Sequence, residues 1–236
     1  MALASLLLSA CLGGDLPQTC EDLPEVPAVG ACFGNPGLEY PGYGTADLAV
    51  TGTVTSVTTG PFPDACDVSF SAVWGSGAEG LILVVTDADG VETTVGLAAP
   101  GLDSPVEEGD RVSLDLAYVF GDFGPDRGRV VLADEAGVEQ LVISVAGTLA
   151  DLATPADVTL DQGDPICTQH DECGAWSAFD FWVTTADDQG VVAYGDEEDI
   201  GPWRVVHAGD EQQTPETSSG CPDWFVAHVA AAFVRE

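Results

Sequence analysis

The chain has 236 residues, 45% of them hydrophobic, so it can bury one sizeable core or two small ones. It carries 40 acidic residues against five arginines and no lysine, which gives a formal net charge of -35 at pH 7. Because nucleic-acid binding needs lysine and arginine to displace counterions from phosphates, this composition excludes that function. The acidity indicates high solubility or adaptation to salty surroundings.

The N-terminus has the features of an export signal. Residues 1–11 contain a short apolar run that ends in small side chains before Cys11, and the run is too short to span a bilayer as a helix. Leu8-Ser9-Ala10-Cys11 resembles the lipobox of bacterial lipoproteins. The resemblance implies a lipid on the sulfur of Cys11 and a membrane anchor in the cell envelope, and Leu12 favours the outer membrane. The alternative is a hydrophobic N-terminal strand or helix over residues 6–11, in a secreted protein.

Six cysteines remain besides Cys11, an even number in a chain with an export signal. We therefore expect disulfide bonds among Cys20, Cys32, Cys66, Cys167, Cys173 and Cys221. The spacing does not choose among the possible pairings, although a bond between Cys20 and Cys32 would close a short local loop.

The chain after the signal divides into three parts. Residues 12–46 are rich in Pro and Gly without periodicity, and we expect a tether. From residue 47 onward, short segments of Val, Thr, Leu and aromatic residues alternate with Gly, Asp and Pro. This pattern predicts an all-β fold, a sandwich or one or more OB-like barrels, disulfide-stapled, in one or two small lobes. A β domain over 47–150 would be followed by a Cys- and Trp-rich lobe over 151–236, which packs on the first or stands apart.

The expected strands are the segments between these Gly, Asp and Pro residues. They cover residues 48–57, 68–74, 81–86, 91–97, 111–119, 129–133, 140–145, 179–184, 191–194 and 203–207. Residues 224–234 fit a closing strand slightly better than a helix. The stretch 47–146 loosely resembles an OB-type barrel, but its acidic character does not suit the nucleic-acid ligands of that fold.

Three acidic turns have similar sequences and each is predicted to close a hairpin. They begin at Asp87, Asp134 and Asp187, and in each a glycine follows three residues later. Common turn chemistry explains them, and a repeat of roughly 50 residues is the alternative. Their carboxylates also make calcium the one metal worth considering, with Asp87, Asp89, Asp187 and Asp188 as candidate ligands.

The segment 161–173 gathers carboxylates, an imidazole and two thiols. Cys167, His170 and Cys173 are spaced like zinc ligands, but a structural zinc needs four ligands and exported thiols are normally oxidised. A disulfide-bounded surface loop is the simpler interpretation. The three histidines, His170, His207 and His228, leave a Ser-His-Asp arrangement open, because its members converge only in space.

The tryptophans are concentrated near the C-terminus. Trp176, Trp182, Trp203 and Trp224 lie in the second lobe, and exposed indole rings can stack on the faces of sugars. These residues are the candidate ligand-binding set, and the alternative is that they fill an aromatic core.

Without a catalytic motif, the sequence predicts an exported acidic envelope lipoprotein that acts as a non-catalytic binding or structural module. Its partners would be the membrane, through the lipid anchor, and a protein or a glycan. Two alternatives stay open: an extracellular protein stabilised by calcium, and an exported hydrolase with a carboxylate active site. No cofactor other than calcium is expected.

Overall fold

The computed structural model describes residues 23–24, 26–35, 44–62, 68–71, 79–121, 124–171, 174–209, 211–213 and 229–236. These residues form antiparallel strands and one short 3-10 helix, Leu149–Asp151, so the all-β prediction is confirmed. None of the described segments is a helix with the length and apolar character needed to cross a membrane.

Most strands belong to one antiparallel sheet. In spatial order it contains β12 (Glu197–Ile200), β13 (Trp203–Gly209), β15 (Val229–Arg235), β8 (Glu139–Ala146), β7 (Gly124–Asp134), β6 (Arg111–Gly121), β2 (Gly44–Pro61), β4 (Glu79–Asp87), β5 (Glu92–Ala98), β1 (Gly30–Gly34) and β3 (Val68–Ser71). The sheet is strongly curled, because β3, at one end of this order, lies beside β7.

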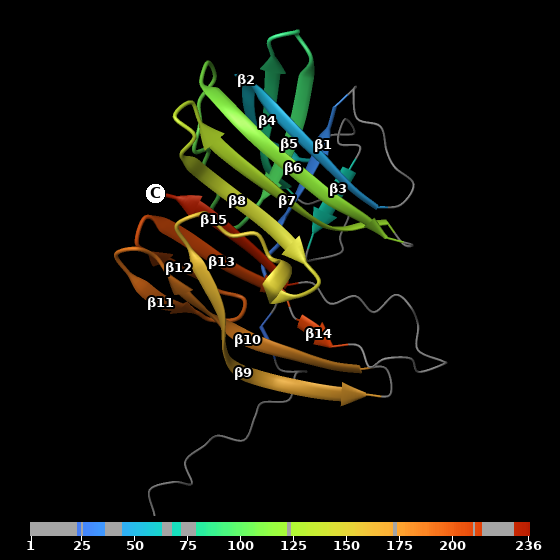
Figure 1. Cartoon of the computed structure of the whole chain (residues 1–236), viewed down its shortest axis with the longest axis vertical. Coiled ribbons are helices and arrows are strands. Elements are labelled where there is room, and N and C mark those ends of the chain that lie inside the picture. Colours follow the sequence, from blue (N-terminus) through green and yellow to red (C-terminus); the bar gives the residue numbers. More distant parts are fainter. Residues whose placement is uncertain are drawn as a thin grey trace, which may run out of the picture.

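A smaller sheet packs against one end of the large one (Figure 1). Its long central strand is β10 (Gly174–Thr184), which pairs with β9 (Thr159–Asp171) on one side. On the other side β10 pairs with β11 (Gln189–Val192) and β14 (Glu211–Gln213).

Three neighbouring strands of the large sheet separate two cores. In β15 the side chains of Ala230, Ala232 and Val234 enter the core inside the curled sheet, whereas Val229, Ala231 and Phe233 enter the core shared with the smaller sheet. Strands β8 and β13 also contribute to both cores. A strand buried on both faces reads as a continuous apolar run, which explains the sequence Val-Ala-Ala-Ala-Phe-Val. The expected closing strand over 224–234 is present as β15 from residue 229 onward, and residues 224–228 lie outside the described part of the chain.

The expected lobes do not correspond to separate sheets. Strands β13 and β15 come from residues 151–236, yet β15 pairs with β8 of the first lobe. The segment 47–146 that resembles an OB-type barrel contributes strands to the long sheet and does not form a five-stranded unit of its own. The reason is that its last strand, β8, continues the pairing into the C-terminal strands.

Part of the expected tether belongs to the core. Strand β1 lies between β3 and β5, and Val29, Ala31 and Phe33 are completely buried. The expectation of a tether over 12–46 was therefore wrong for these residues. A five-residue strand buried among neighbours has no alternating pattern for the sequence to display.

Cys32 and Cys167 are each disulfide-bonded. Cys20, Cys66, Cys173 and Cys221 lie outside the described residues, as does Cys11. The expected bond between Cys20 and Cys32 stays a prediction.

Two of the three acidic turns are nearly identical hairpins. In both, the aspartate Oδ1 accepts hydrogen bonds of 2.9 Å from two backbone N–H groups, those of Asp89 and Val91 in the first and of Ala136 and Val138 in the second. The third turn differs, because it begins at Thr185, whose N–H donates to the Asp188 carbonyl at 2.9 Å. The prediction from residue spacing was therefore right for two turns and misplaced for the third.

Candidate ligand-binding face

The candidate site lies on the outer side of the smaller sheet. Along β10, Phe179, Phe181 and Val183 point inward to the core shared by the two sheets. Trp182 lies between them in sequence and therefore points the other way, with 53% of its surface exposed. Together with Val191, which is 51% exposed and pairs with it across the strands, this ring forms a small exposed apolar patch, a feature that marks binding surfaces.

The strands on either side of β10 add exposed side chains beside Trp182, in two rows that run across the three strands. Asp161 of β9 and Val191 of β11 pair directly with Trp182, and Thr159 and Gln189 pair with Thr184. Directly paired residues in antiparallel strands place their side chains on the same side of the sheet. All six side chains are exposed. We call this surface the Trp182 face; it consists of Thr159, Asp161, Trp182, Thr184, Gln189 and Val191.

A glycine in the adjacent strand holds the indole close to the sheet. A Cβ atom at Gly163 would lie 2.9 Å from both Cδ1 and Nε1 of Trp182, and 2.7 Å from the carbonyl oxygen of Asp180. Any larger residue would push the ring away. The absence of a side chain at Gly163 therefore lets the ring lie against β9.

Behind the face, the sheet is supported by a buried histidine. The ring of His207 stacks on Phe181 with centroids 3.6 Å apart and planes 12° apart. Its Nε2–H donates to the carbonyl of Phe179 at 2.7 Å, because a carbonyl only accepts. Burial lowers the pKa of His207 to about 4, so the ring is neutral at pH 7. Its Nδ1 has no hydrogen-bond partner among the described residues. We assign His207 a structural role.

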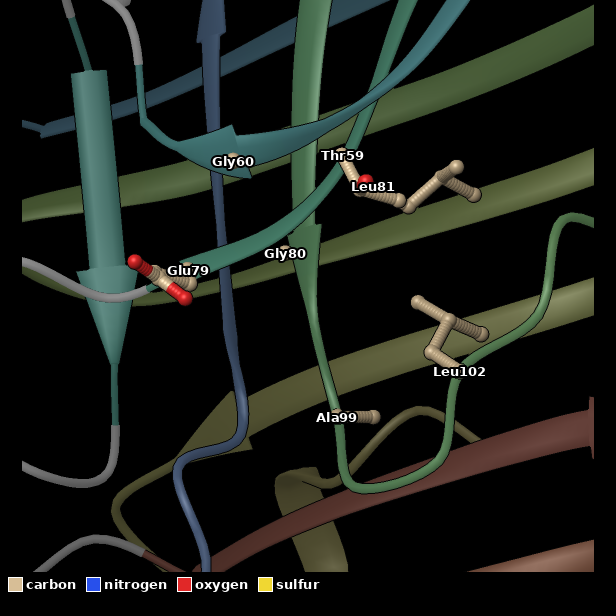
Figure 2. A pocket seen from close by; sticks show the side chains of 7 residues that line it. All are labelled: Thr59, Gly60, Glu79, Gly80, Leu81, Ala99 and Leu102. Atoms are coloured by element: carbon tan, nitrogen blue, oxygen red, sulfur yellow. The ribbon is translucent and has the colours of Figure 1, made fainter.

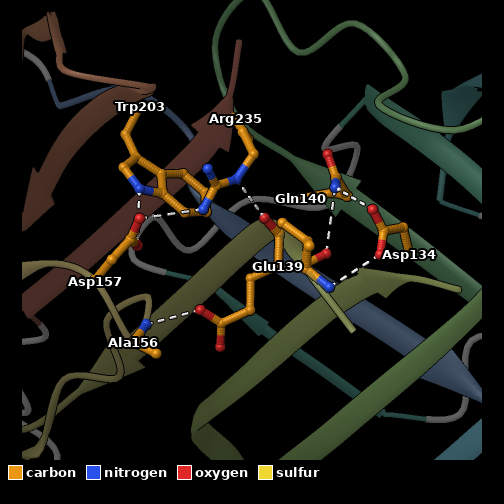
Figure 3. Close-up of polar contacts among 8 residues, drawn as sticks. Asp134, Glu139, Gln140, Ala156, Asp157, Trp203 and Arg235 are labelled. Atoms are coloured by element: carbon orange, nitrogen blue, oxygen red, sulfur yellow. Dashed lines mark hydrogen bonds and ion pairs between the residues drawn. The ribbon is translucent and has the colours of Figure 1, made fainter. Parts of the chain in front are cut away.

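Trp203, another candidate for ligand binding, is completely buried. Its Nε1–H donates to Asp157 Oδ1 at 3.0 Å, and the guanidinium of Arg235 lies 4.3 Å from the ring centroid (Figure 3). The expectation that Trp203 contacts ligand was therefore wrong, because β13 lies between two cores. The backbone of Trp176 lies in β10, and its side chain, like Trp224, lies outside the described part of the structure.

The acidic turns use their carboxylates for their own backbone. Asp87 Oδ1 binds two N–H groups of its turn, while Asp188 Oδ1 and Oδ2 accept from Gln189 N and Gly201 N. In the described part of the chain, no three Asp, Glu, His or Cys side chains are grouped to hold a metal. The expected calcium ligands Asp87, Asp89, Asp187 and Asp188 are split between a turn after β4 and a turn after β10.

The zinc alternative around Cys167 is weakened by its disulfide bond, because a bonded sulfur is no thiolate ligand. His170 belongs to β9 without a described side chain, and Cys173 lies outside the described residues. The disulfide-bounded interpretation of this segment fits the state of Cys167.

A separate cleft of about 460 Å³ lies beside the end of β2, the start of β4 and the end of β5 (Figure 2). Its lining is mostly backbone and aliphatic: Thr59, Gly60, Glu79, Gly80, Leu81, Ala99 and Leu102. Glu79 is the one titratable side chain among these lining residues, so they do not include the paired acids of a glycosidase.

Comparison with protein families, curated proteins and solved structures finds no match for this chain. The sequence singles out Trp182 as a candidate, but its neighbours on the face follow only from the strand pairing. A usable signal was present, because Asp180, Trp182 and Thr184 alternate with the apolar Phe179, Phe181 and Val183.

Proposed function

We propose that the protein is an exported, non-catalytic binding module and that its Trp182 face binds a carbohydrate. The observation that carries the proposal is the half-exposed indole of Trp182 on the outer side of a sheet whose inner side is fully packed. Aromatic rings are rigid and apolar, so they offer contact area to a sugar ring at little conformational cost.

The polar neighbours of the ring suit the same ligand. Thr159 and Thr184 carry hydroxyls, Gln189 an amide and Asp161 a carboxylate, and these groups supply donors and acceptors for sugar hydroxyls. Val191, which is 51% exposed, extends the apolar strip. A surface exposed to water in this way supports binding better than it supports chemistry, which needs a site closed to water.

The direct test is a glycan-array screen of the protein, followed by titration of the best ligand against variants. Trp182→Ala should abolish binding, and Gly163→Ala should weaken it by displacing the ring without removing it. Val191→Ala should weaken binding, whereas Val138→Ala, which removes the same atoms from an exposed turn of the large sheet, should not. Ligand binding unchanged in Trp182→Ala would refute the proposal.

We further propose that the module is held at a bacterial envelope by lipid on Cys11, with the outer membrane favoured. The lipobox-like Leu8-Ser9-Ala10-Cys11 motivates this, and the disulfide bonds of Cys32 and Cys167 support an oxidising compartment. We also propose disulfide bonds among the six cysteines after Cys11. In the native host, Cys11→Ser should move the protein from the membrane to the soluble fraction, and mass spectrometry should find lipid on wild-type Cys11. An unmodified Cys11 thiol would contradict the anchor.

A further inference from the structure

The Trp182 face carries negative charge beside its aromatic ring. Asp161 pairs with Trp182 across the strands, so its exposed carboxylate lies on the same side of the sheet as the indole. Asp180 precedes Trp182 by two residues in the same strand and therefore shares that side. Its Oδ1 accepts a hydrogen bond of 3.0 Å from Tyr194 N, which fixes the position of this carboxylate.

The strands of the smaller sheet contain no lysine or arginine that could neutralise these carboxylates. Between Arg129 and Arg204 the chain has neither Lys nor Arg. The nearest arginines in sequence are already engaged on the large sheet: Arg204 donates to the carbonyl of Gly101 at 2.7 Å, and Arg129 pairs with Asp115 at 3.2 Å. Arg235 pairs with Asp157, and neither Asp161 nor Asp180 takes part in an ion pair among the described residues, so the face presents negative charge to its ligand.

The indole adds a second attraction for cations. The face of an aromatic ring carries negative electrostatic potential, and tryptophan is the strongest of the aromatic residues in binding an ammonium or guanidinium. The net charge of -35 has the same sign, so it raises the local concentration of cations and repels polyanions.

Resting on the proposed function, we infer that the ligand of the Trp182 face is a cationic carbohydrate, a sugar chain with free amino groups. The apolar side of one sugar ring lies on the indole of Trp182. An ammonium group on that sugar or its neighbour lies against Asp161, which provides a charge-assisted hydrogen bond. An N-acetylated chain of the same length keeps the stacking and loses the charge.

The test uses that matched pair of ligands. Isothermal titration with an oligosaccharide of glucosamine, at a pH where its amines are protonated, is compared with the fully N-acetylated oligosaccharide of equal length. We expect the amino form to bind at least about tenfold more tightly at low salt, and the difference to shrink in about 1 M NaCl because ions screen the attraction. Equal affinity for the two, or tighter binding of the acetylated form, would overturn the inference and leave the proposed function standing. Binding of neither oligosaccharide would count against both.

Variants separate a specific site from general attraction. Asp161→Asn should reduce the preference for the amino form several-fold and leave the acetylated form unaffected, whereas Asp89→Asn removes the same charge from a turn of the large sheet and should change nothing. An equal effect of both substitutions would assign the preference to net charge and overturn the inference. A short oligolysine that binds as tightly as the amino sugar and depends equally on Trp182 would also overturn it, in favour of a cationic peptide.

Discussion

The rings of Phe181 and His207 stack with a centroid separation of 3.6 Å, and this contact joins the smaller sheet to the large one. Phe181 belongs to β10, and the next residue in that strand, Trp182, points to solvent from the opposite side. The packing of Phe181 on the inner face of β10 therefore holds in place the strand that carries Trp182 on its outer face.

The buried histidine makes stability depend on pH. Burial lowers the pKa of His207 from 6.5 to about 4, so the unfolded chain takes up the proton first. The stability that the neutral ring contributes is fully present above pH 6.5, the pKa of the unfolded chain, and is lost as the pH falls through about 4. The lowered pKa corresponds to a loss of about 3 kcal/mol in the free energy of unfolding. Urea unfolding between pH 7.5 and about 4 measures this slope.

His207→Phe provides the control for that slope. It keeps an aromatic ring beside Phe181 but leaves the carbonyl of Phe179 without its donor, so we expect about 1 kcal/mol less stability at neutral pH. Across the same acid range the variant should lose less stability than the wild type. If both proteins lose stability in parallel, the assignment of the slope to His207 is wrong.

Two aspartate–arginine pairs should differ in their effect on stability. Asp157 lies 3.2 Å from Arg235 and also accepts from the indole of buried Trp203, whereas Asp115 pairs with Arg129 in a more exposed setting. Asp157→Ala leaves the indole N–H without its acceptor and should lower the free energy of unfolding by about 2 kcal/mol. Asp115→Ala should lower it by about 0.5 kcal/mol or less. Equal losses in thermal or urea unfolding would contradict this.

The two matching hairpins should respond alike to substitution. Gly90 and Gly137 have φ of +81° and +80°, and no atom lies within 4 Å of a Cβ added at either position. Alanine would therefore introduce backbone strain alone, at about 1 kcal/mol in each turn, and asparagine less. Urea midpoints of the four variants measure this. Wild-type midpoints for both alanine variants would show that the left-handed conformation is not required.

The net charge of -35 should make the protein more stable in salt. Screening lengths fall from about 10 Å at 0.1 M to about 3 Å at 1 M, which weakens repulsion among the carboxylates. We expect the Tm to rise by at least about 3 °C over this range of NaCl. Sorbitol at matched osmolality controls for general solute effects, and a Tm that falls or stays constant in NaCl would contradict the expectation.

Local patterns predicted strands that turn residues enclose, whether one face is buried, as in β4, or both faces, as in β13. The segment 81–86 lies within β4, which has three further residues, and 203–207 lies within β13, which has two, because turn residues bound each of them. The turns at Asp87 and Asp134 followed from the chemistry of aspartate and glycine. In contrast, β1 gave no signal, because a short strand buried between neighbours shows no alternation.

The pairing of distant strands was not readable from local sequence. Contacts such as Phe233 with Val142 join residues far apart in the chain, and no local pattern specifies that β15 lies between β8 and β13. The same limit applied to the tryptophans. Trp203 and Trp182 both lie in apolar strands. The smaller sheet packs on the large one, and the core between them buries Trp203, whereas Trp182 points away from that core and is exposed.

The most direct test of the account is a crystal structure of the protein with an oligosaccharide that it binds. The account predicts a sugar ring lying flat on the indole of Trp182, with polar contacts to Asp161 and Gln189 on the neighbouring strands. A sugar bound in the cleft beside Leu81 and Leu102, with no sugar in contact with the Trp182 ring, would contradict this proposal.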